Sequence, residues 1–350
     1  MPTLKPIRRV SPMADAVDHL SKFDLSIDSI LTTDSAKARK DRSRAFAMLY
    51  ESPARALAMA CDPSTVSDVA PRGYLADVAA LAESRGMLAT AINHNGCRFS
   101  TAGCRAGCLA FSGHGGLSVA VQSCRARRTL SRLADPVAYA RAVVLATCRE
   151  LSRARSVGLP LALRLNGTQE TPWHRLRFPV SLADVVAIRS RFGVDLETGD
   201  DLNILEAFKR FNPDLSFYEY LKAPVDHLDG LNAWRAAGWD VTSSFAADRI
   251  TACSDAIAAV SSGFRVAFPV AIAKGQPIPS AVVISSSGKS VTLPAVDGDR
   301  TDARFFDPAR SAVILRAKKS RGADPGTMAR FILPNTPRIK FFDGSLEFIA

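Results

Sequence analysis

The sequence predicts a single α/β domain built like a β/α barrel, and three observations support that class. Short apolar segments alternate with helical segments over the second half of the chain. The connections between them are short, which is typical of a parallel sheet covered by helices. Polar residues gather just beyond the ends of the expected strands, and in β/α barrels that face carries the chemistry.

The N-terminal part of the chain predicts mainly helices. We expect a basic N-terminal arm over residues 1–45, with a short helix at 13–23. Apolar residues at helical spacing predict a helix over 45–60 and another over 75–85. Residues 87–93 form a short apolar run, which predicts a buried strand that leads into the next segment.

Two long helices are expected next. Apolar side chains recur at helical spacing over 117–133, and Asp135 followed by Pro136 is a typical start for a second helix that reaches Leu151. Cys124 and Cys148 fall on the apolar faces of these two helices. Both thiols are therefore expected to pack in the core and not to bind a ligand.

The remaining segments follow one plan. The expected strands are 159–165, 215–220, 239–242, 264–270, 281–284 and 312–315. The expected helices are 182–192, 202–211, 227–237 and 250–261. Three consecutive serines followed by a glycine within 284–291 predict a hairpin turn. We take residues 46–335 as one α/β domain, followed by a C-terminal tail at 336–350.

Three of the seven cysteines, Cys97, Cys104 and Cys108, fall within twelve residues of a segment rich in Gly and Ser. We call residues 95–108 the cysteine loop. A loop cannot bury three thiols as core side chains, whereas thiolates from one short segment can converge on a metal with little loss of chain entropy. Their spacing is not the paired two-residue spacing of zinc ribbons. The alternatives are a cluster of reduced thiols, or a disulfide beside one free thiol.

Three thiolates without an obvious fourth suit a metal site with one open position. An iron–sulfur cubane or a zinc ion fits this donor set, and zinc would need a further ligand such as His94, His114 or water. The loop follows an expected strand, as the cluster-binding cysteines do in radical-SAM barrels, although the spacing there differs. This analogy of position makes S-adenosylmethionine a co-ligand to test.

Composition indicates the cellular compartment and the broad class of protein. With 47% hydrophobic and 23% charged residues, the chain resembles an ordinary soluble globular protein. No apolar run reaches the length of a membrane span, and no signal peptide is evident. An odd number of cysteines without a disulfide framework indicates a reducing compartment, so we expect the cytoplasm and no membrane partner. No nucleophile elbow is present, which argues against a hydrolase triad.

The net charge of +11 favours a polyanionic partner, either a nucleic acid or a nucleotide. A basic run lies at 37–44, and residues 98–132 contain six arginines and no acid. Phosphate contacts are expected from Arg98, Arg105, Arg125, Arg128 and Arg132. The last three recur at helical spacing and share one face, which is either a phosphate-binding rim or a merely solvated surface.

Polar residues past two expected strands form a first candidate group for a substrate pocket. Its members are Asn166, Thr168, Tyr218, Tyr220 and Lys222. On a strand, the two tyrosines and the lysine share one face and could form a substrate wall. Tyr218 and Lys222 also have the spacing of nucleases that form a phosphotyrosine, but the paired histidines that such nucleases need for their metal are missing.

A second candidate group is rich in carboxylates. Its members are Asp297, Asp299, Asp302 and Arg304. Carboxylates so close in sequence suit Mg²⁺ or Mn²⁺, although the spacing misses that of a calcium-binding loop. The alternative is a tight turn in which Asp–Arg pairs hold the backbone, and we favour it for Asp307-Pro308.

Taken in order, these motifs resemble the phage proteins that carry a gene product 88 domain, over roughly residues 45–333. The matching motifs are Asn95-Gly96-Cys97, Gly103-Cys104, Cys108-Leu109, Ser112-Gly113-His114-Gly115, Arg125 with Arg128-Thr129, Arg164-Leu165-Asn166-Gly167-Thr168, Pro172-Trp173, Phe217-Tyr218-Glu219-Tyr220-Leu221-Lys222, Asp297-Gly298-Asp299 with Asp302 and Arg304, Asp307-Pro308, and Arg316-Ala317-Lys318. The sequence departs from the family at Arg98, commonly proline, and at His114, commonly arginine. The resemblance implies a bacteriophage or prophage origin and expression in a bacterial cytoplasm. It leaves the chemistry open.

Two functions stay open at this point. In the first, an enzyme holds a metal ion or iron–sulfur cluster on the three cysteines and acts on a nucleotide or nucleic acid at the strand ends. In the second, a replication-associated phage protein binds nucleic acid through its arginines, and its metal loop is structural, without catalysis. We favour the enzyme because polar groups recur past successive strand ends, which arginine stripes alone do not require.

Overall fold

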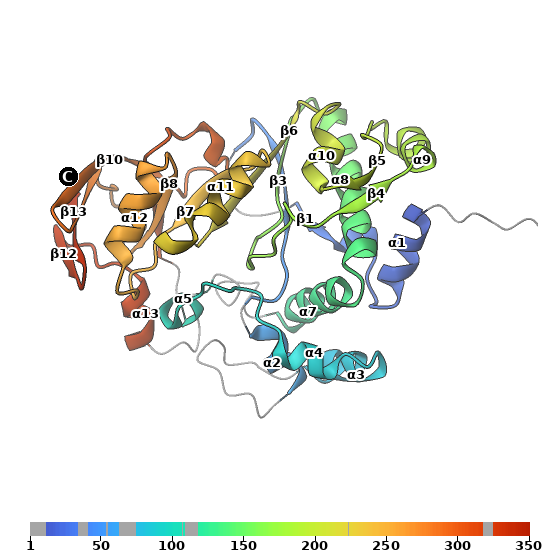
Figure 1. Cartoon of the computed structure of the whole chain (residues 1–350), viewed down its shortest axis with the longest axis horizontal. Helices are drawn as coiled ribbons and strands as arrows, with labels where there is room; N and C mark the ends of the chain where they lie inside the picture. The colour runs from blue at the N-terminus through green and yellow to red at the C-terminus, as the bar shows by residue number, and fades with distance from the viewer. Residues whose placement is uncertain are drawn as a thin grey trace, which may run out of the picture.

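The computed structural model describes residues 12–33, 41–53, 55–62, 75–106, 108, 118–222, 224–317 and 325–350. Its main element is one sheet, which runs across the molecule in Figure 1. In spatial order its strands are β1 (Leu31–Thr32), β2 (Ala45–Leu49), β3 (Leu161–Arg164), β6 (Leu215–Leu221), β7 (Asp240–Ser244), β8 (Arg265–Val270), β11 (Ala312–Arg316), β10 (Lys289–Asp297), β9 (Ala281–Ser286), β13 (Gly344–Ile349) and β12 (Arg338–Phe341).

The central part of this sheet is parallel. Each neighbouring pair from β2 through β10 runs in the same direction, whereas β1 at one end and β9, β13 and β12 at the other pair antiparallel. The prediction of an α/β domain with a largely parallel sheet is therefore confirmed. The strand order is linear, and the described residues contain no strand pair that closes it into a barrel.

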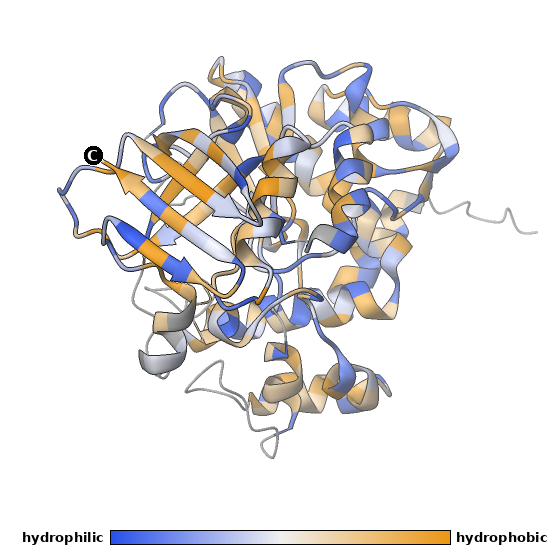
Figure 2. Cartoon of the chain, turned by 60° about the vertical axis from the view of Figure 1, so that its left-hand side comes forward, coloured by the Kyte–Doolittle hydropathy of each residue, from blue (hydrophilic) through white to orange (hydrophobic). Residues whose placement is uncertain are grey.

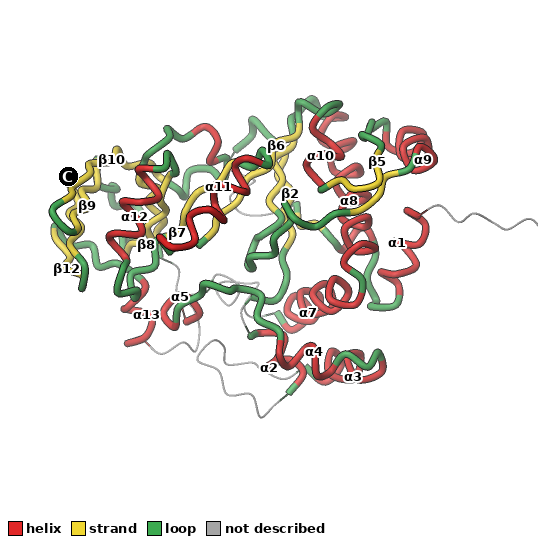
Figure 3. Tube along the Cα trace, in the orientation of Figure 1, coloured by secondary structure: helices red, strands yellow, loops and turns green. Residues whose placement is uncertain are grey.

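Helices pack on the sheet and beside it. They are α1 (Pro12–Ser21), α2 (Ala56–Cys61), α3 (Ala76–Ser84), α4 (Leu88–Asn93), α5 (Ala102–Ala106), α7 (Val119–Ala134), α8 (Pro136–Ser156), α9 (Leu182–Phe192), α10 (Ile204–Lys209), α11 (Leu228–Ala236), α12 (Ala252–Ser261) and α13 (Pro325–Phe331). Helices α8, α10, α11 and α12 contact the strands, while α2, α3, α4 and α7 pack together at one edge (Figure 3). A separate pair, β4 (Phe178–Val180) and β5 (Gly199–Leu202), precedes α10.

Most element predictions after residue 117 are confirmed. The six expected strands correspond to β3, β6, β7, β8, β9 and β11, and the four shorter helices to α9, α10, α11 and α12. The Ser118 and Asp135 side chains accept backbone N–H groups at the starts of α7 and α8, and Pro136 occupies the first turn. These caps satisfy donors that have no partner inside a helix, so the local sequence sets both starts.

Two predictions in the first hundred residues are wrong. The segment 45–60 was expected to be helical, but it contains β2 before α2 begins at Ala56. Residues 87–93 were expected to form a strand and instead contain the helix α4. Both runs are short and apolar, and β2 is buried on both faces, so periodicity does not separate strand from helix. Two alanines in α4 add helix propensity that decides the second case.

The described parts of both terminal segments pack against the main body. Met13, Ala16 and Leu20 of α1 are buried, and this helix packs against α8. The expected C-terminal tail carries β12 and β13, and β13 pairs with β9 along its length. The described residues therefore show neither a detached arm nor a loose tail, and residues 37–40 of the basic run lie outside them.

The two faces of the parallel strands have different neighbours. Ala47, Leu49 and Phe217 face the main core, whereas Phe46, Met48 and Tyr218 form a second cluster with Ala162 and Ala303. This alternation follows from the two-residue repeat of a strand. Figure 2 shows the same mixing of apolar and polar residues along the strands near the C-terminus. No helix among the described residues is long and apolar enough to cross a membrane.

Glu219 lies on β6 between Phe217 and Leu221, two residues of the main core. Its carboxylate accepts the backbone N–H groups of Leu165 at 2.9 Å and Asn166 at 3.1 Å, just past β3. Burial raises the pKa of Glu219 from 4.5 to about 8, against the opposing effect of Arg164. The folded state therefore keeps a proton that the unfolded chain releases above pH 4.5.

We expect Glu219→Gln to flatten the pH dependence of stability. Between about pH 4.5 and 8 the native state binds more protons than the unfolded state, so this group makes the free energy of unfolding fall as pH rises. Glutamine cannot ionise and keeps an oxygen for the two N–H groups. Urea unfolding at pH 5, 6, 7 and 8 measures the effect, with exposed Glu83→Gln as control. If the free energy of unfolding changed with pH equally in Glu219→Gln and the wild type, the prediction would be contradicted.

Candidate functional site

A cavity of about 1200 Å³, which includes space open to solvent, lies at the carboxyl ends of the parallel strands. It is lined by Arg164 of β3, by Tyr220 of β6 and Lys222 directly after it, by Ser244 of β7, and by Arg316 of β11. Parallel strands bring their carboxyl ends to one edge of a sheet, so residues far apart in sequence meet there. Of the predicted pocket residues, Tyr220 and Lys222 lie at this edge, and their role in binding a substrate stays a prediction.

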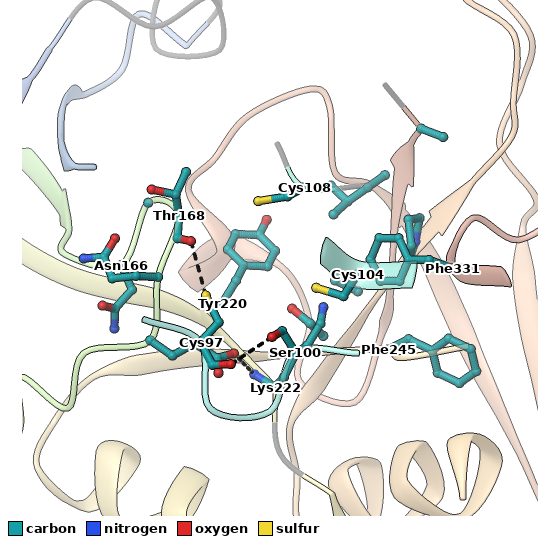
Figure 4. Close-up of a pocket in the computed structure, with 18 of the residues that line it drawn as sticks. Cys97, Ser100, Cys104, Cys108, Asn166, Thr168, Tyr220, Lys222, Phe245 and Phe331 are labelled. Carbon is teal, nitrogen blue, oxygen red and sulfur yellow. Dashed lines mark hydrogen bonds between the residues drawn. The ribbon is translucent and has the colours of Figure 1, made fainter. Parts of the chain in front are cut away.

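The three cysteines of the cysteine loop line this same cavity. In the view of Figure 4, the sulfur atoms of Cys97, Cys104 and Cys108 lie around the ring of Tyr220. The Sγ atom of Cys97 is 3.5 Å from the carbonyl oxygen of Thr168. Among the described residues, no three His, Cys, Asp or Glu side chains lie close enough to hold one metal ion. The thiols thus share a cavity without converging on a common point.

Lys222 provides positive charge beside the thiols. Burial lowers the pKa of its ammonium group, but a charge interaction and a hydrogen bond with Cys104, together with Glu170, outweigh burial and raise it. The Nζ atom also lies 4.8 Å from the centre of the Phe331 ring. Lys222 thus places a cation beside Cys104 in the wall of the cavity.

Arg164, Tyr220 and Asp302 line another part of the cavity. The guanidinium group of Arg164 lies over the Tyr220 ring at 4.6 Å, and its Nε donates to the Asn166 carbonyl at 3.1 Å. Burial lowers the pKa of Arg164, but the nearby Tyr218, Glu219 and Asp302 outweigh burial, so the pKa is raised. The arginine therefore stays charged. Its place at the end of an expected strand could have marked it as a site residue.

Several predicted pocket residues instead support the structure around the cavity. The Asn166 amide exchanges two hydrogen bonds with the Thr171 backbone, and the Thr168 hydroxyl donates to the Glu51 carbonyl at 2.6 Å. Tyr218 packs in the second cluster, with its ring fully buried. Arg304 is also fully buried and pairs with Asp307 at 2.8 Å. Asn166 and Thr168 still border the cavity, whereas Tyr218 and Arg304 do not line it.

The carboxylates after β10 form ion pairs with an arginine of β11. Asp297 contacts the Arg316 Nη1 atom through both oxygens at 2.9 Å, and Asp299 accepts the Arg316 backbone N–H at 2.8 Å. These contacts agree with the alternative of a turn held by Asp–Arg pairs. Asp299, Asp302 and Arg316 line the cavity, but Asp297 does not. Sequence reasoning missed Arg316 as a site residue.

The arginine stripe of α7 is not a solvated surface. Arg125 and Arg128 are buried, and Arg128 donates to the carbonyl groups of Tyr50 and Ser29. Arg125 lies over the Tyr50 ring at 5.4 Å. Arg132 pairs with the buried Glu51 at 2.7 Å. These contacts engage all three guanidinium groups within the protein, so they do not form an exposed cationic rim, and phosphate binding by them stays a prediction. Arg98 is exposed, and Arg105 donates to the Ser100 carbonyl.

Of the two histidines suggested as extra ligands, the structure describes only His94. His94 does not line the cavity, and burial, followed by the charge of Arg132, lowers its pKa to about 4. His114 lies outside the described residues. Cys148 is fully buried, as predicted, and Cys124 packs against the main core.

Comparison with known proteins gives one assignment. The model of the family described as Gene product 88 matches residues 63–331, which is more than half of the chain. The chain belongs to the Gene product 88 family. The matched region includes the whole cysteine loop, Lys222, Asp299 and Asp302, and it contains every residue that lines the cavity except Ile332. No curated protein and no solved structure matches the chain.

Proposed function

We propose that this Gene product 88 protein is an enzyme that holds an iron–sulfur cluster or a metal ion on Cys97, Cys104 and Cys108. Its substrate is a nucleotide or nucleic acid bound in the same cavity. We also propose that the parallel strands form an incomplete barrel around this cavity, and that the protein acts in the cytoplasm of a bacterial host.

One observation carries the proposal: the three thiols line a cavity whose other walls bear charged side chains. A structural metal site closes its ligands tightly around the ion, whereas a catalytic site leaves a position open to a second molecule. The cavity is open to solvent and also takes in Arg164, Lys222 and Arg316, so a second molecule could reach a group held by the thiols.

The residues present fit a thiolate-bound group in their chemistry. Three cysteines from one short segment supply soft donors, and Lys222 beside Cys104 offsets their negative charge. A three-cysteine cubane leaves one iron open to a small ligand, and S-adenosylmethionine is the co-ligand that we would test first. When bound, the group would supply electron transfer or Lewis-acid chemistry, while Lys222 and Arg164 would bind and orient anionic parts of a substrate.

The charge of the cavity supports the substrate class. Arg164, Lys222 and Arg316 contribute cations, and Asp299 and Asp302 contribute carboxylates, on walls formed by four different strands and their following loops. Cations bind phosphate or carboxylate groups, and the Tyr220 ring offers an aromatic surface for a planar group. The alternative, a nucleic-acid-binding replication protein without catalysis, loses support because Arg125, Arg128 and Arg132 already bind protein groups.

Purification without oxygen, followed by reconstitution with iron and sulfide, tests the proposal. We expect a coloured protein with iron and sulfide in defined stoichiometry, or zinc retained through purification if the ion is zinc. Equilibrium binding of S-adenosylmethionine and of nucleotides to the loaded protein then tests the second ligand. A colourless, metal-free protein after reconstitution would remove the basis of the proposal. Steep salt-dependent binding of nucleic acid by that metal-free protein would favour the alternative.

A further inference from the structure

The backbone of the cysteine loop is held by side chains from the segment after β7. We call residues 245–251 the post-β7 loop. The Oδ2 atom of Asp248 accepts the N–H of Gly103 at 2.8 Å, and the Nη2 atom of Arg249 donates to the carbonyl of Phe99 at 2.6 Å. Phe99 lies between Cys97 and Cys104, and Gly103 directly precedes Cys104. Both contacts therefore act on the backbone that carries these two thiols.

Gly103 is required for this close approach. A Cβ atom at Gly103 would lie 2.8 Å from the Phe331 Cβ atom and 2.9 Å from Asp248 Oδ2. Helix α5, which carries Cys104, packs directly against α13 (Figure 1). Because Gly103 has no side chain, α5 can contact both Asp248 and α13. The position of Cys104 is thus set by contacts that involve no thiol.

Arg249 is itself anchored. Its Nη1 atom lies 3.6 Å from Asp255 Oδ2, and both side chains are largely buried. The same carboxylate accepts the Thr251 hydroxyl at 3.1 Å. Because Asp255 lies in the first turn of α12, the post-β7 loop is tied to a helix that packs on β8. A residue held this firmly can fix the group that it contacts.

Glu170 holds the opposite side of the cysteine loop. Its backbone N–H donates to the Gly96 carbonyl at 2.8 Å, and its carboxylate accepts the N–H groups of Lys222, at 2.8 Å, and Phe99. Glu170 follows β3, and Lys222 follows β6. The loop is therefore clamped between segments that follow three strands of the parallel sheet: β3, β6 and β7.

We propose that Asp248 and Arg249 are positioning residues that hold the backbone of the cysteine loop in place at the cavity before any metal binds. This differs from zinc fingers, in which the metal itself orders the loop. The inference rests on the proposed function for its purpose, but its physical content concerns the metal-free protein. It also predicts that residues outside the ligand set control loading, as groups behind metal ligands commonly do.

The test compares Asp248→Ala and Arg249→Met with the wild type in metal-free protein. Hydrogen exchange at the Gly103 amide should become about 10-fold faster or more in Asp248→Ala, because a hydrogen bond to a carboxylate is lost. Trypsin should cleave after exposed Arg98 faster in both variants. Asp248→Asn keeps an oxygen acceptor and should recover part of the protection. Asp229→Ala, at an exposed position of α11, is the control.

Reconstitution of the same variants gives a second readout. We expect Asp248→Ala and Arg249→Met to bind less iron and sulfide than the wild type under equal conditions. Faster exchange in variants of a protein that never binds metal would support the positioning role while the proposed function fails. Unchanged exchange and cleavage in both variants would overturn the inference, even if the wild type binds a cluster.

Discussion

Replacing Arg132 by methionine is expected to lower the free energy of unfolding by about 3–5 kcal/mol, the range for breaking a buried ion pair. The partner, Glu51, is fully buried, and its Oε2 atom lies 2.7 Å from Arg132 Nε. Without the guanidinium group, a carboxylate would stay buried with its charge uncompensated. Glu51 also holds the segment after β3 through Thr168, so the effect would reach the cavity wall.

Urea unfolding measures this effect, and two further variants identify its cause. Arg153→Met removes an arginine whose side chain is 69% exposed and 3.5 Å from Glu150, so it should cost less than about 1 kcal/mol. The double variant Arg132→Met with Glu51→Gln removes both charges and should recover part of the loss. A loss below about 1 kcal/mol for Arg132→Met would show that the pair contributes little.

Cys104→Ser is expected to abolish stable loading with iron and sulfide, or with zinc. Serine has the size of cysteine but not its soft thiolate, so the remaining two thiols would not hold the group alone. Metal and sulfide analysis after reconstitution without oxygen measures the result. Cys124→Ser is the matched control, because Cys124 does not line the cavity and its loss should leave the loading unchanged.

The same variant separates the two functions. If the loop serves an enzyme, Cys104→Ser should remove activity and leave the melting temperature of the metal-free protein nearly unchanged. If the metal is only structural, the main effect should be that the variant, after reconstitution, melts at a lower temperature than the loaded wild type. Full loading of Cys104→Ser would remove Cys104 from the ligand set.

The sequence was most informative where local chemistry decides the structure. The helix start at Asp135-Pro136 and the alternation of strands and helices predicted most of the elements after residue 117. The cysteine loop was placed at the strand ends, although the strand expected before it is the helix α4. The loop reaches the cavity through contacts with Asp248, Arg249 and Glu170, which no local pattern reveals.

Tertiary partners decided the remaining cases. Helical spacing placed Arg125, Arg128 and Arg132 on one face, but only the fold brings Ser29, Tyr50 and Glu51 to meet that face. Asn166 had the position of a substrate ligand, yet its amide is satisfied by Thr171 within the same turn. The raised pKa of Glu219 depends on its burial, which the order of residues along the chain does not reveal.

The strand order also bears on where this protein can be cut. The family match spans 63–331, yet β2, which lies before it, pairs with β3, and β13, which lies after it, pairs with β9. A fragment trimmed to the match would leave the backbone groups of β3 and β9 without these neighbours, and bare strand edges promote aggregation. The region that the family model matches is thus shorter than the region whose strands pair in one sheet.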